Sequence, residues 1–173
     1  MFGNTESLAA IVGAGLSEAG AIVEIVDVRD AAAVDLSGSD LLVVAAPTHA
    51  LSLSRPESRA QAVERGADPA KAELGVREWL VELERLLPTI SPQPVAAVFD
   101  TRVTQTRHWP GSAAHRAART LRHEGFRVVA RTSFYVEGIA GPLSPGESER
   151  AREWGAGLPE LAVPGGPIDH RHS

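Results

Sequence analysis

The sequence predicts an α/β fold, in which helices alternate with the strands of a parallel sheet and cover both of its faces. Residues 41–46 and 94–99 are apolar runs without polar alternation, as expected of strands buried on both faces. Amphipathic helical patterns, bounded by glycine or proline, lie between these runs and on either side of them. This alternation indicates right-handed crossovers between parallel strands.

The first third of the chain predicts one helix and two strands. Apolar residues from Leu8 to Leu16 recur at the i, i+3, i+4 and i+8 spacing of one buried helix face. Residues 21–28 predict a strand, which we place near a sheet edge because it carries two acidic side chains. The buried strand at residues 41–46 is expected to end in a loop at residues 47–50.

The rest of the chain predicts further helices and strands in the same alternation. In order, we expect a polar connection with helical pieces at 51–72, helix 74–87, strand 94–99, a loop at 100–102, helix 112–123, strand 126–130, an irregular stretch at 133–143 and helix 147–161. We interpret residues 1–162 as one domain and residues 163–173 as a disordered tail.

The composition argues against several classes of function. The net charge of −5 argues against a nucleic-acid binder, which normally carries a basic surface. The chain has no cysteine, and His170 and His172 stand in the tail without supporting ligands, so we expect no metal site. No apolar run approaches the roughly 20 residues that cross a membrane. We therefore expect a cytoplasmic protein that does not associate with membranes.

The start of the chain has the chemistry of a phosphate site. Gly3 permits a tight turn, Asn4 is a preferred N-cap residue, and Thr5 and Glu6 suit the first turn of the helix that follows. Such a turn presents unpaired backbone N–H groups and a hydroxyl at the positive end of the helix dipole. Every helix N-terminus shares some of these features, so this signal alone is weak.

These segments resemble the flavodoxin family. The phosphate loop of that family has the form Ser/Thr-x-Thr-Gly-x-Thr, and residues 2–5 match its last four positions, with Phe2 in place of a threonine. The resemblance covers the chain to about residue 162. It is similar to small flavodoxin-domain proteins in the segments at residues 47–50, 54–56, 99–102 and 134–138.

The resemblance implies a flavodoxin-like three-layer α/β/α sandwich with strand order 2-1-3-4-5. In such a sheet the ligand binds where the winding reverses, outside the carboxyl ends of strands 1 and 3. Strand 1 is absent from this chain and would lie before Met1. A central strand contributes roughly 10 kcal/mol through its buried apolar side chains. We therefore expect the working protein to begin upstream of Met1.

The resemblance further implies FMN binding and electron transfer with an unidentified redox partner protein or reductase. The first loop of the family wraps the FMN phosphate, and two later loops hold the isoalloxazine ring. Carried over to this chain, the cofactor-binding residues would be Phe2, Gly3, Asn4, Thr5, Pro47, Thr48, His49, Ala50, Asp100, Thr101 and Arg102. We expect no catalytic side chain, because the flavin itself carries the chemistry.

The ring-binding loops depart from the family pattern. Flavodoxins commonly stack aromatic side chains on both faces of the ring, whereas here one loop offers His49 and the other has no ring before His108 and Trp109. For Trp109, stacking on flavin and plain packing are equally compatible with the sequence. Positive charge from three nearby arginines would stabilise the anionic reduced flavin and raise its potential. These arginines are Arg55, Arg102 and Arg107.

Two other functions remain open: an NAD(P)H-dependent flavin or quinone reductase, and a flavin-free interaction domain. Residues 135–138 are interpreted as structural or as a contact between two copies, so a homodimer is a candidate state. The sequence lacks the motifs that mark two other classes of α/β enzyme. The Gly13-Ala14-Gly15 segment lies within a helix and has Glu18 where a dinucleotide fingerprint needs glycine, and there is no G-x-S-x-G elbow.

Overall fold

The computed structural model describes residues 3–31, 35–49 and 51–163, and it confirms the predicted α/β architecture. The helices are α1 (Asn4–Glu18), α2 (Pro56–Glu64), α3 (Val76–Leu86), α4 (Ala113–His123) and α5 (Glu147–Ala162). The strands are β1 (Leu41–His49), β2 (Ser52–Leu53), β3 (Val95–Val103) and β4 (Val128–Val136). Short 3₁₀ turns occupy Pro69–Ala72, Leu87–Thr89 and Thr104–Thr106. All but one residue of the expected tail, as well as Phe2 and Ala50, lie outside the described residues.

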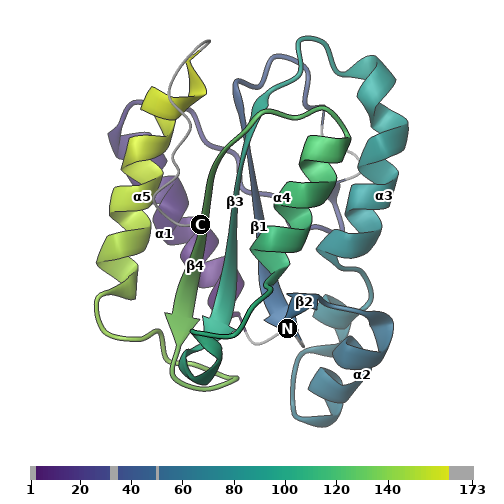
Figure 1. Cartoon of the computed structure of the whole chain (residues 1–173), viewed down its shortest axis with the longest axis vertical. Coiled ribbons are helices and arrows are strands. Elements are labelled where there is room, and N and C mark those ends of the chain that lie inside the picture. Colours follow the sequence, from purple (N-terminus) through teal and green to yellow (C-terminus); the bar gives the residue numbers. More distant parts are fainter. Residues whose placement is uncertain (1–2, 32–34, 50, 164–173) are drawn as a thin grey trace.

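The molecule has three layers, with α1 and α5 on one face of the sheet and α3 and α4 on the other (Figure 1). The side chains of β3 alternate between the two cores. Ala96 and Val98 pack under α3 and α4, whereas Ala97 and Phe99 pack under α1 and α5. This strand is buried on both faces, as its unbroken apolar sequence predicts.

The sheet order is β2-β1-β3-β4, which agrees only roughly with the predicted 2-1-3-4-5 order. β1, β3 and β4 are parallel neighbours, as expected. β2 was not predicted: it is a two-residue strand that folds back antiparallel on Thr48 and His49. Along residues 41–47 the other edge of β1 has no strand partner in the described part of the chain.

The predicted strand at residues 21–28 is the main error of the sequence-based fold. Ala21 and Val23 pack against the core under α1 and α5, and the side chain of Ile22 is fully exposed, but no residue of the segment belongs to a described strand. The backbone that could pair with it is β1, and a cavity separates the two: residues 25–28 line one side of it, and Ala45 and Ala46 the other. The apolar, β-branched composition of the segment predicted a strand, whereas a strand also needs a hydrogen-bonded neighbour.

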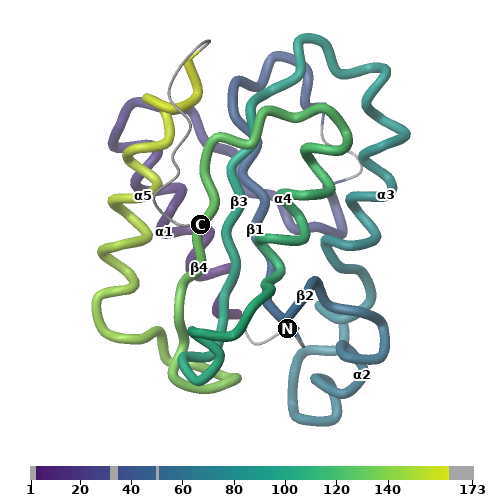
Figure 2. Tube along the Cα trace, viewed as in Figure 1, coloured from purple at the N-terminus to yellow at the C-terminus, as the bar shows by residue number. Residues whose placement is uncertain are grey.

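Two predicted loops are the last residues of strands. β1 continues through Pro47, Thr48 and His49, and β3 continues through residues 100–102, where the sequence predicted turns. β4 likewise extends to Val136, into the stretch expected to be irregular. The polar side chains at these positions suggested loops. The positions are instead strand ends, where successive side chains point to opposite faces of the sheet. The bends and turns lie a few residues later, and α2 and β2 gather at this end of the sheet (Figure 2).

Helices α1 and α5 cross in close contact because each has a glycine at the crossing. A Cβ atom on Gly155 would lie 2.3 Å from the carbonyl oxygen of Val12, and one on Gly15 would lie 2.1 Å from that of Arg152. Below them, the rings of Phe99, Phe134 and Trp154 meet edge to face. The two helices therefore form one rigid layer behind β3 and β4.

Candidate functional site

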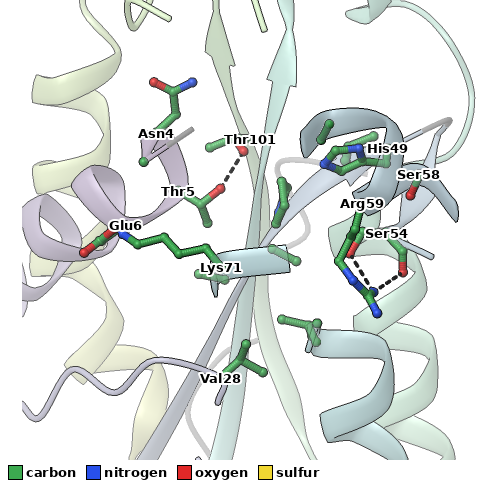
Figure 3. A pocket seen from close by; sticks show the side chains of 18 of the residues that line it. Asn4, Thr5, Glu6, Val28, His49, Ser54, Ser58, Arg59, Lys71 and Thr101 are labelled. Atoms are coloured by element: carbon green, nitrogen blue, oxygen red, sulfur yellow. Dashed lines mark hydrogen bonds and ion pairs between the residues drawn. The ribbon is translucent and has the colours of Figure 1, made fainter. Parts of the chain in front are cut away.

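A cavity of about 550 Å³ opens at the carboxyl ends of β1 and β3. Its walls come from distant parts of the sequence. Asn4 and Thr5 of α1 lie on one side, and His49 and Arg59 lie on the other (Figure 3). Residues 25–28 extend the lining along the unpaired edge of β1. A cavity of this volume is typical of small-molecule sites. We call it the first cavity.

The N-terminus of α1 faces the first cavity and is uncapped. Gly3 is its N-cap residue, with a left-handed φ of 85° and no side-chain cap, so Asn4 is the first helical residue rather than the predicted cap. A Cβ on Gly3 would have no heavy atom within 4 Å, so the space above it is open. The first N–H groups of a helix have no partner within the helix. They lie here beside a cavity, as an anion site requires.

Two threonine hydroxyls join α1 to β3 beside the first cavity, near the N-terminus of α1. The Oγ1 atoms of Thr5 and Thr101 are 2.8 Å apart and form a hydrogen bond. One hydroxyl donates in this bond, which leaves the other with a hydrogen for a second acceptor. Both residues were predicted to contact the cofactor, and both line the first cavity.

Asn4 holds the loop after β4 against the same cavity. Its Nδ2 donates to the carbonyl oxygen of Ile139 at 3.3 Å, and a Cβ on Gly141 would lie 2.8 Å from its Oδ1. Ile139 and Val136 consequently line the first cavity. The sequence had suggested a structural role or a contact between two copies for the neighbouring residues 135–138. No motif marks Asn4 and Ile139 as partners, because their contact depends on the tertiary fold.

His49 lies where β1 turns into β2, with its ring half buried against the cavity. Burial lowers the pKa of His49, and the guanidinium of Arg59 lowers it further. The ring is therefore neutral near pH 7. A neutral, planar imidazole at this wall can pack against a flat ligand or share a hydrogen bond without adding charge.

We expect acid to destabilise the fold partly through His49. A histidine in an unfolded chain titrates near pH 6.5, and because the folded pKa is lower, the folded state binds fewer protons between the two values. The stability is present in full above the unfolded pKa and is lost as the pH falls below it. The lowered pKa of His115 acts in the same direction. Denaturant titrations at about pH 7.5 and about pH 5.5 should show a smaller difference for His49→Gln than for the wild type. An unchanged difference would contradict this role.

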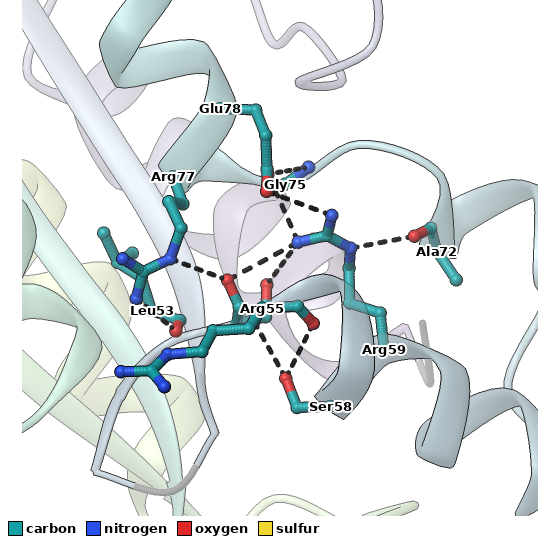
Figure 4. Close-up of polar contacts among 9 residues, drawn as sticks. Leu53, Arg55, Ser58, Arg59, Ala72, Gly75, Arg77 and Glu78 are labelled. Atoms are coloured by element: carbon teal, nitrogen blue, oxygen red, sulfur yellow. Dashed lines mark hydrogen bonds and ion pairs between the residues drawn. The ribbon is translucent and has the colours of Figure 1, made fainter.

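Arg59 is the polar centre of the wall opposite α1 and was not predicted. It is 3% exposed and pairs with Glu78 at 3.1 Å. Its Nε donates to the carbonyl oxygen of Ala72, and its Nη1 donates to Ser54 (Figure 4). These contacts tie α2, the 3₁₀ turn and α3 to β2. One arginine within a polar, alanine-rich connection gave no sequence signal of this role.

A second unpredicted pair crosses the cavity between Lys71 and Glu6 (Figure 3). Lys71 lies on the 3₁₀ turn and Glu6 on the first turn of α1, so the ion pair links the two walls. The hydrogen bond to Glu6 raises the pKa of Lys71. An acidic side chain in the first turn was predicted, whereas its partner 65 residues later was not.

Asp100 does not reach the first cavity, contrary to prediction. It is fully buried, and its Oδ2 accepts hydrogen bonds from Thr48 Oγ1 at 2.9 Å and from the backbone N–H of Ala114 at 2.7 Å. Thr48 in turn accepts from the N–H of Ala113. Asp100 and Thr48 therefore fasten the start of α4 to the sheet.

Arg102 faces away from the first cavity as well. Because strand residues alternate, Thr101 points to the α1 side of the sheet and its neighbour Arg102 to the α4 side. The Nη2 of Arg102 donates to the carbonyl oxygens of Thr106 and Trp109. Of the eleven predicted residues, those that line the first cavity are Gly3, Asn4, Thr5, Pro47, Thr48, His49 and Thr101.

The three arginines expected near the ring lie elsewhere. Arg102 and Arg107 line a different cavity, and Arg55 is not among the residues that line the first one. The cationic residues that do line it are Arg59, Arg65 and Lys71, and the first and last of these have carboxylate partners. The geometry thus removes the basis for expecting a raised flavin potential.

Comparisons with solved structures find two proteins of similar architecture. A flavodiiron protein from Giardia intestinalis superimposes with a TM-score of 0.62 at 16% identity, covering 94% of this chain but 34% of that one. A flavodoxin from the domain Archaea superimposes with a TM-score of 0.58 at 17% identity, covering 92% of this chain and 91% of that one. The chain spans about a third of the flavodiiron protein.

The remaining comparisons give no closer assignment. No protein-family model and no curated protein matches the sequence. In the described residues no helix is both long and apolar enough to cross a membrane. At such low identity the two structural neighbours establish architecture rather than activity. The chain has a flavodoxin-like fold.

Proposed function

We propose that the chain binds FMN in the first cavity and serves as an electron-transfer protein. The observation that supports this most is the uncapped N-terminus of α1, with Gly3 in a left-handed conformation under open space and beside a cavity of about 550 Å³. The two structural neighbours are a flavodoxin and a flavodiiron protein, which agrees with a flavin ligand.

The residues present suit the two ends of FMN. The first N–H groups of α1 and a hydroxyl of the Thr5–Thr101 pair would hold the phosphate. His49 would contact the ring from one side, and Val136 and Ile139 would add apolar walls. Lys71 lines the same cavity and pairs with Glu6, so the two side chains together would bring little net charge to the phosphate end.

FMN supplies the redox chemistry when bound, and the protein holds and shields it. The neutral His49 and the paired Arg59 bring little net charge to the wall that the ring would contact. We therefore place the chain with electron carriers. A purified protein that oxidised NAD(P)H with a quinone acceptor would instead belong to the reductases, and one without affinity for flavin would be an interaction domain.

A charge placed at the α1 N-terminus tests the phosphate site. We expect Asn4→Asp to weaken FMN binding by roughly tenfold or more, because the new carboxylate repels a phosphate at the same N–H groups. Its effect on riboflavin, which has no phosphate, should be smaller, because only the lost hydrogen bond from Asn4 to Ile139 would act on it. The fold should tolerate the change, since an acidic residue suits the first turn of a helix. Fluorescence titrations of both flavins against both proteins measure the two affinities.

Ala14→Asp is the matched control. Ala14 is exposed on the same helix, more than two turns from Asn4. An aspartate at this position therefore adds the same charge away from the cavity. FMN affinity should stay near the wild-type value in this variant. Equal loss of FMN and riboflavin affinity in Asn4→Asp would contradict a phosphate at the α1 N-terminus.

A further inference from the structure

A second cavity of about 620 Å³ lies on the α4 side of the sheet, at the carboxyl ends of β3 and β4. It differs sharply from the first one in charge. Its lining includes four arginines and a histidine and, in the described part of the chain, no aspartate or glutamate. The arginines are Arg102, Arg107, Arg131 and Arg150. In a chain with a net charge of −5, such a concentration of positive charge needs an explanation.

Arg102 is the buried member of this group. It is 7% exposed and sits on β3, where two of its hydrogen bonds hold the carbonyl oxygens of Thr106 and Trp109. Its Nε is buried and has no hydrogen-bond acceptor among the described residues. A buried guanidinium with only neutral acceptors is costly, and an anion beside it would offset that cost.

Arg107 and two aromatic rings form the outer wall. The guanidinium carbon of Arg107 lies 5.0 Å from the centroid of the Tyr135 ring. Trp109 is 58% exposed, although a tryptophan of a soluble domain is usually buried over most of its area. The described residues provide no carboxylate in ion-pair distance of Arg107. The wall thus combines a cation with an uncovered indole.

His115 lies in a positive electrostatic potential. Its Nδ1 faces an Nη1 atom of Arg131, which donates to it. Burial lowers the pKa of His115, and the charges of Arg131, Arg119 and Arg122 lower it further. Arg150 contributes less, because Glu147 accepts two hydrogen bonds from its guanidinium. Of the three arginines that act on His115, Arg131 lines the second cavity, whereas Arg119 and Arg122 belong to α4 and lie outside its lining.

The backbone N–H groups at the start of α4 are not available to bind an anion in the second cavity. The N–H groups of Ala113, Ala114 and His115 donate to Thr48, Asp100 and Ser112, respectively. Asp100 itself is turned toward these N–H groups and is not part of the cavity lining. An anion in the second cavity would depend on arginine side chains, which bind phosphate oxygens through their planar set of donors.

We propose that the second cavity binds a phosphorylated nucleotide, with its phosphate at Arg102, Arg107 and Arg131 and its base against Trp109. The arginines account for the phosphate, and the exposed indole beside them accounts for a flat ring, since stacking on an aromatic side chain suits any base. A volume of about 620 Å³ is within the range of small-molecule sites. The site is separate from the first cavity, because Thr101 and Arg102 point to opposite sides of β3.

Calorimetric titration with AMP tests this site directly. AMP should bind more tightly than either inorganic phosphate or adenosine, because each of these offers only one of the two recognised groups. AMP should also quench the fluorescence of Trp109, since Trp79 is buried and Trp154 packs in the core. Trp109→Phe should remove the quenching and keep most of the affinity. Binding of phosphate and AMP with equal affinity would reduce the site to a simple anion site and overturn the nucleotide proposal.

Arg107→Met is the main variant, because Arg107 is exposed and its loss leaves the core intact. We expect it to weaken AMP binding by about tenfold, the usual consequence of losing a charged contact with phosphate. Arg85→Met, on the outer face of α3 and away from both cavities, is the matched control and should bind AMP like the wild type. Equal affinities in Arg107→Met and Arg85→Met would overturn the proposal.

Competition with FMN separates this site from the first cavity. Saturating FMN should leave AMP binding unchanged, and Asn4→Asp should not weaken it. Displacement of AMP by FMN would instead place the nucleotide at the α1 N-terminus and overturn a separate site. Failure of FMN to bind at all would refute the proposed function alone, because AMP binding in the second cavity does not depend on flavin.

Discussion

Gly155→Ala should destabilise the protein by about 1–3 kcal/mol. The added Cβ would lie 2.3 Å from the carbonyl oxygen of Val12 and 3.1 Å from its Cα, both backbone atoms that cannot rotate away. α1 and α5 would have to move apart, which loosens the core that they share with Phe99 and Phe134. Because the N-terminus of α1 lines the first cavity, ligand affinity should fall along with stability. Chemical denaturation followed by circular dichroism measures the change.

Gly157→Ala is the matched control on the same helix. A Cβ on Gly157 has no heavy atom within 4 Å, and the position is exposed. Alanine there should stabilise the helix by about 0.5–1 kcal/mol, because it loses less conformational freedom than glycine. The two substitutions are chemically identical and should have opposite signs. A stable Gly155→Ala protein would show that α1 and α5 do not cross as closely as described.

Arg59→Met should cost about 2–4 kcal/mol and loosen the wall opposite α1. The substitution keeps most of the side-chain volume but removes the partner of Glu78 and the donors to Ala72 and Ser54. Glu78 would keep only the hydrogen bond from the Gly75 N–H among those that its carboxylate makes in the described structure. Equilibrium unfolding gives the energy, and limited proteolysis between α2 and α3 shows whether the loss is local.

Arg85→Met provides the comparison for an arginine–carboxylate pair. Arg85 and Glu82 are 75% and 43% exposed, and an exposed pair of this kind contributes only about 0–1 kcal/mol. The contrast between the two arginines tests burial, because the residue change is the same. If Arg59→Met were as stable as Arg85→Met, the network of Figure 4 would not hold this region together.

The architecture could be predicted because it depends on local patterns. The unbroken apolar run at β3, the helical spacing from Leu8 to Leu16 and the amphipathic pattern that ends at Pro88 each indicate an element locally. Residues 21–28 show the limit of this reasoning. Their apolar, β-branched composition favours a strand, but whether a strand forms depends on a partner that no local pattern contains. The expected strand before Met1 stays a prediction.

The resemblance placed Gly3, Asn4 and Thr5 in the first turn of a helix and His49 in a loop after a strand, and the structure brings all four to the first cavity. That they bind a cofactor stays a prediction. Asp100 and Arg102 show what could not be predicted in this way.

Treating residues 100–102 as a loop removed the alternation that sends Thr101 to one side of β3 and its two neighbours to the other. Arg59 and Lys71 could not be found from spacing, because their partners are defined only by the tertiary fold.

The most direct test of the central claim is a titration of the purified protein with FMN, followed by flavin fluorescence and the visible absorption spectrum. Binding in the first cavity predicts saturable quenching at one FMN per chain, a shifted flavin band, and a large loss of affinity in Asn4→Asp but not in Ala14→Asp. A flavin signal that is identical with and without protein would contradict FMN binding. The flavodoxin-like fold would then serve a function that does not use flavin.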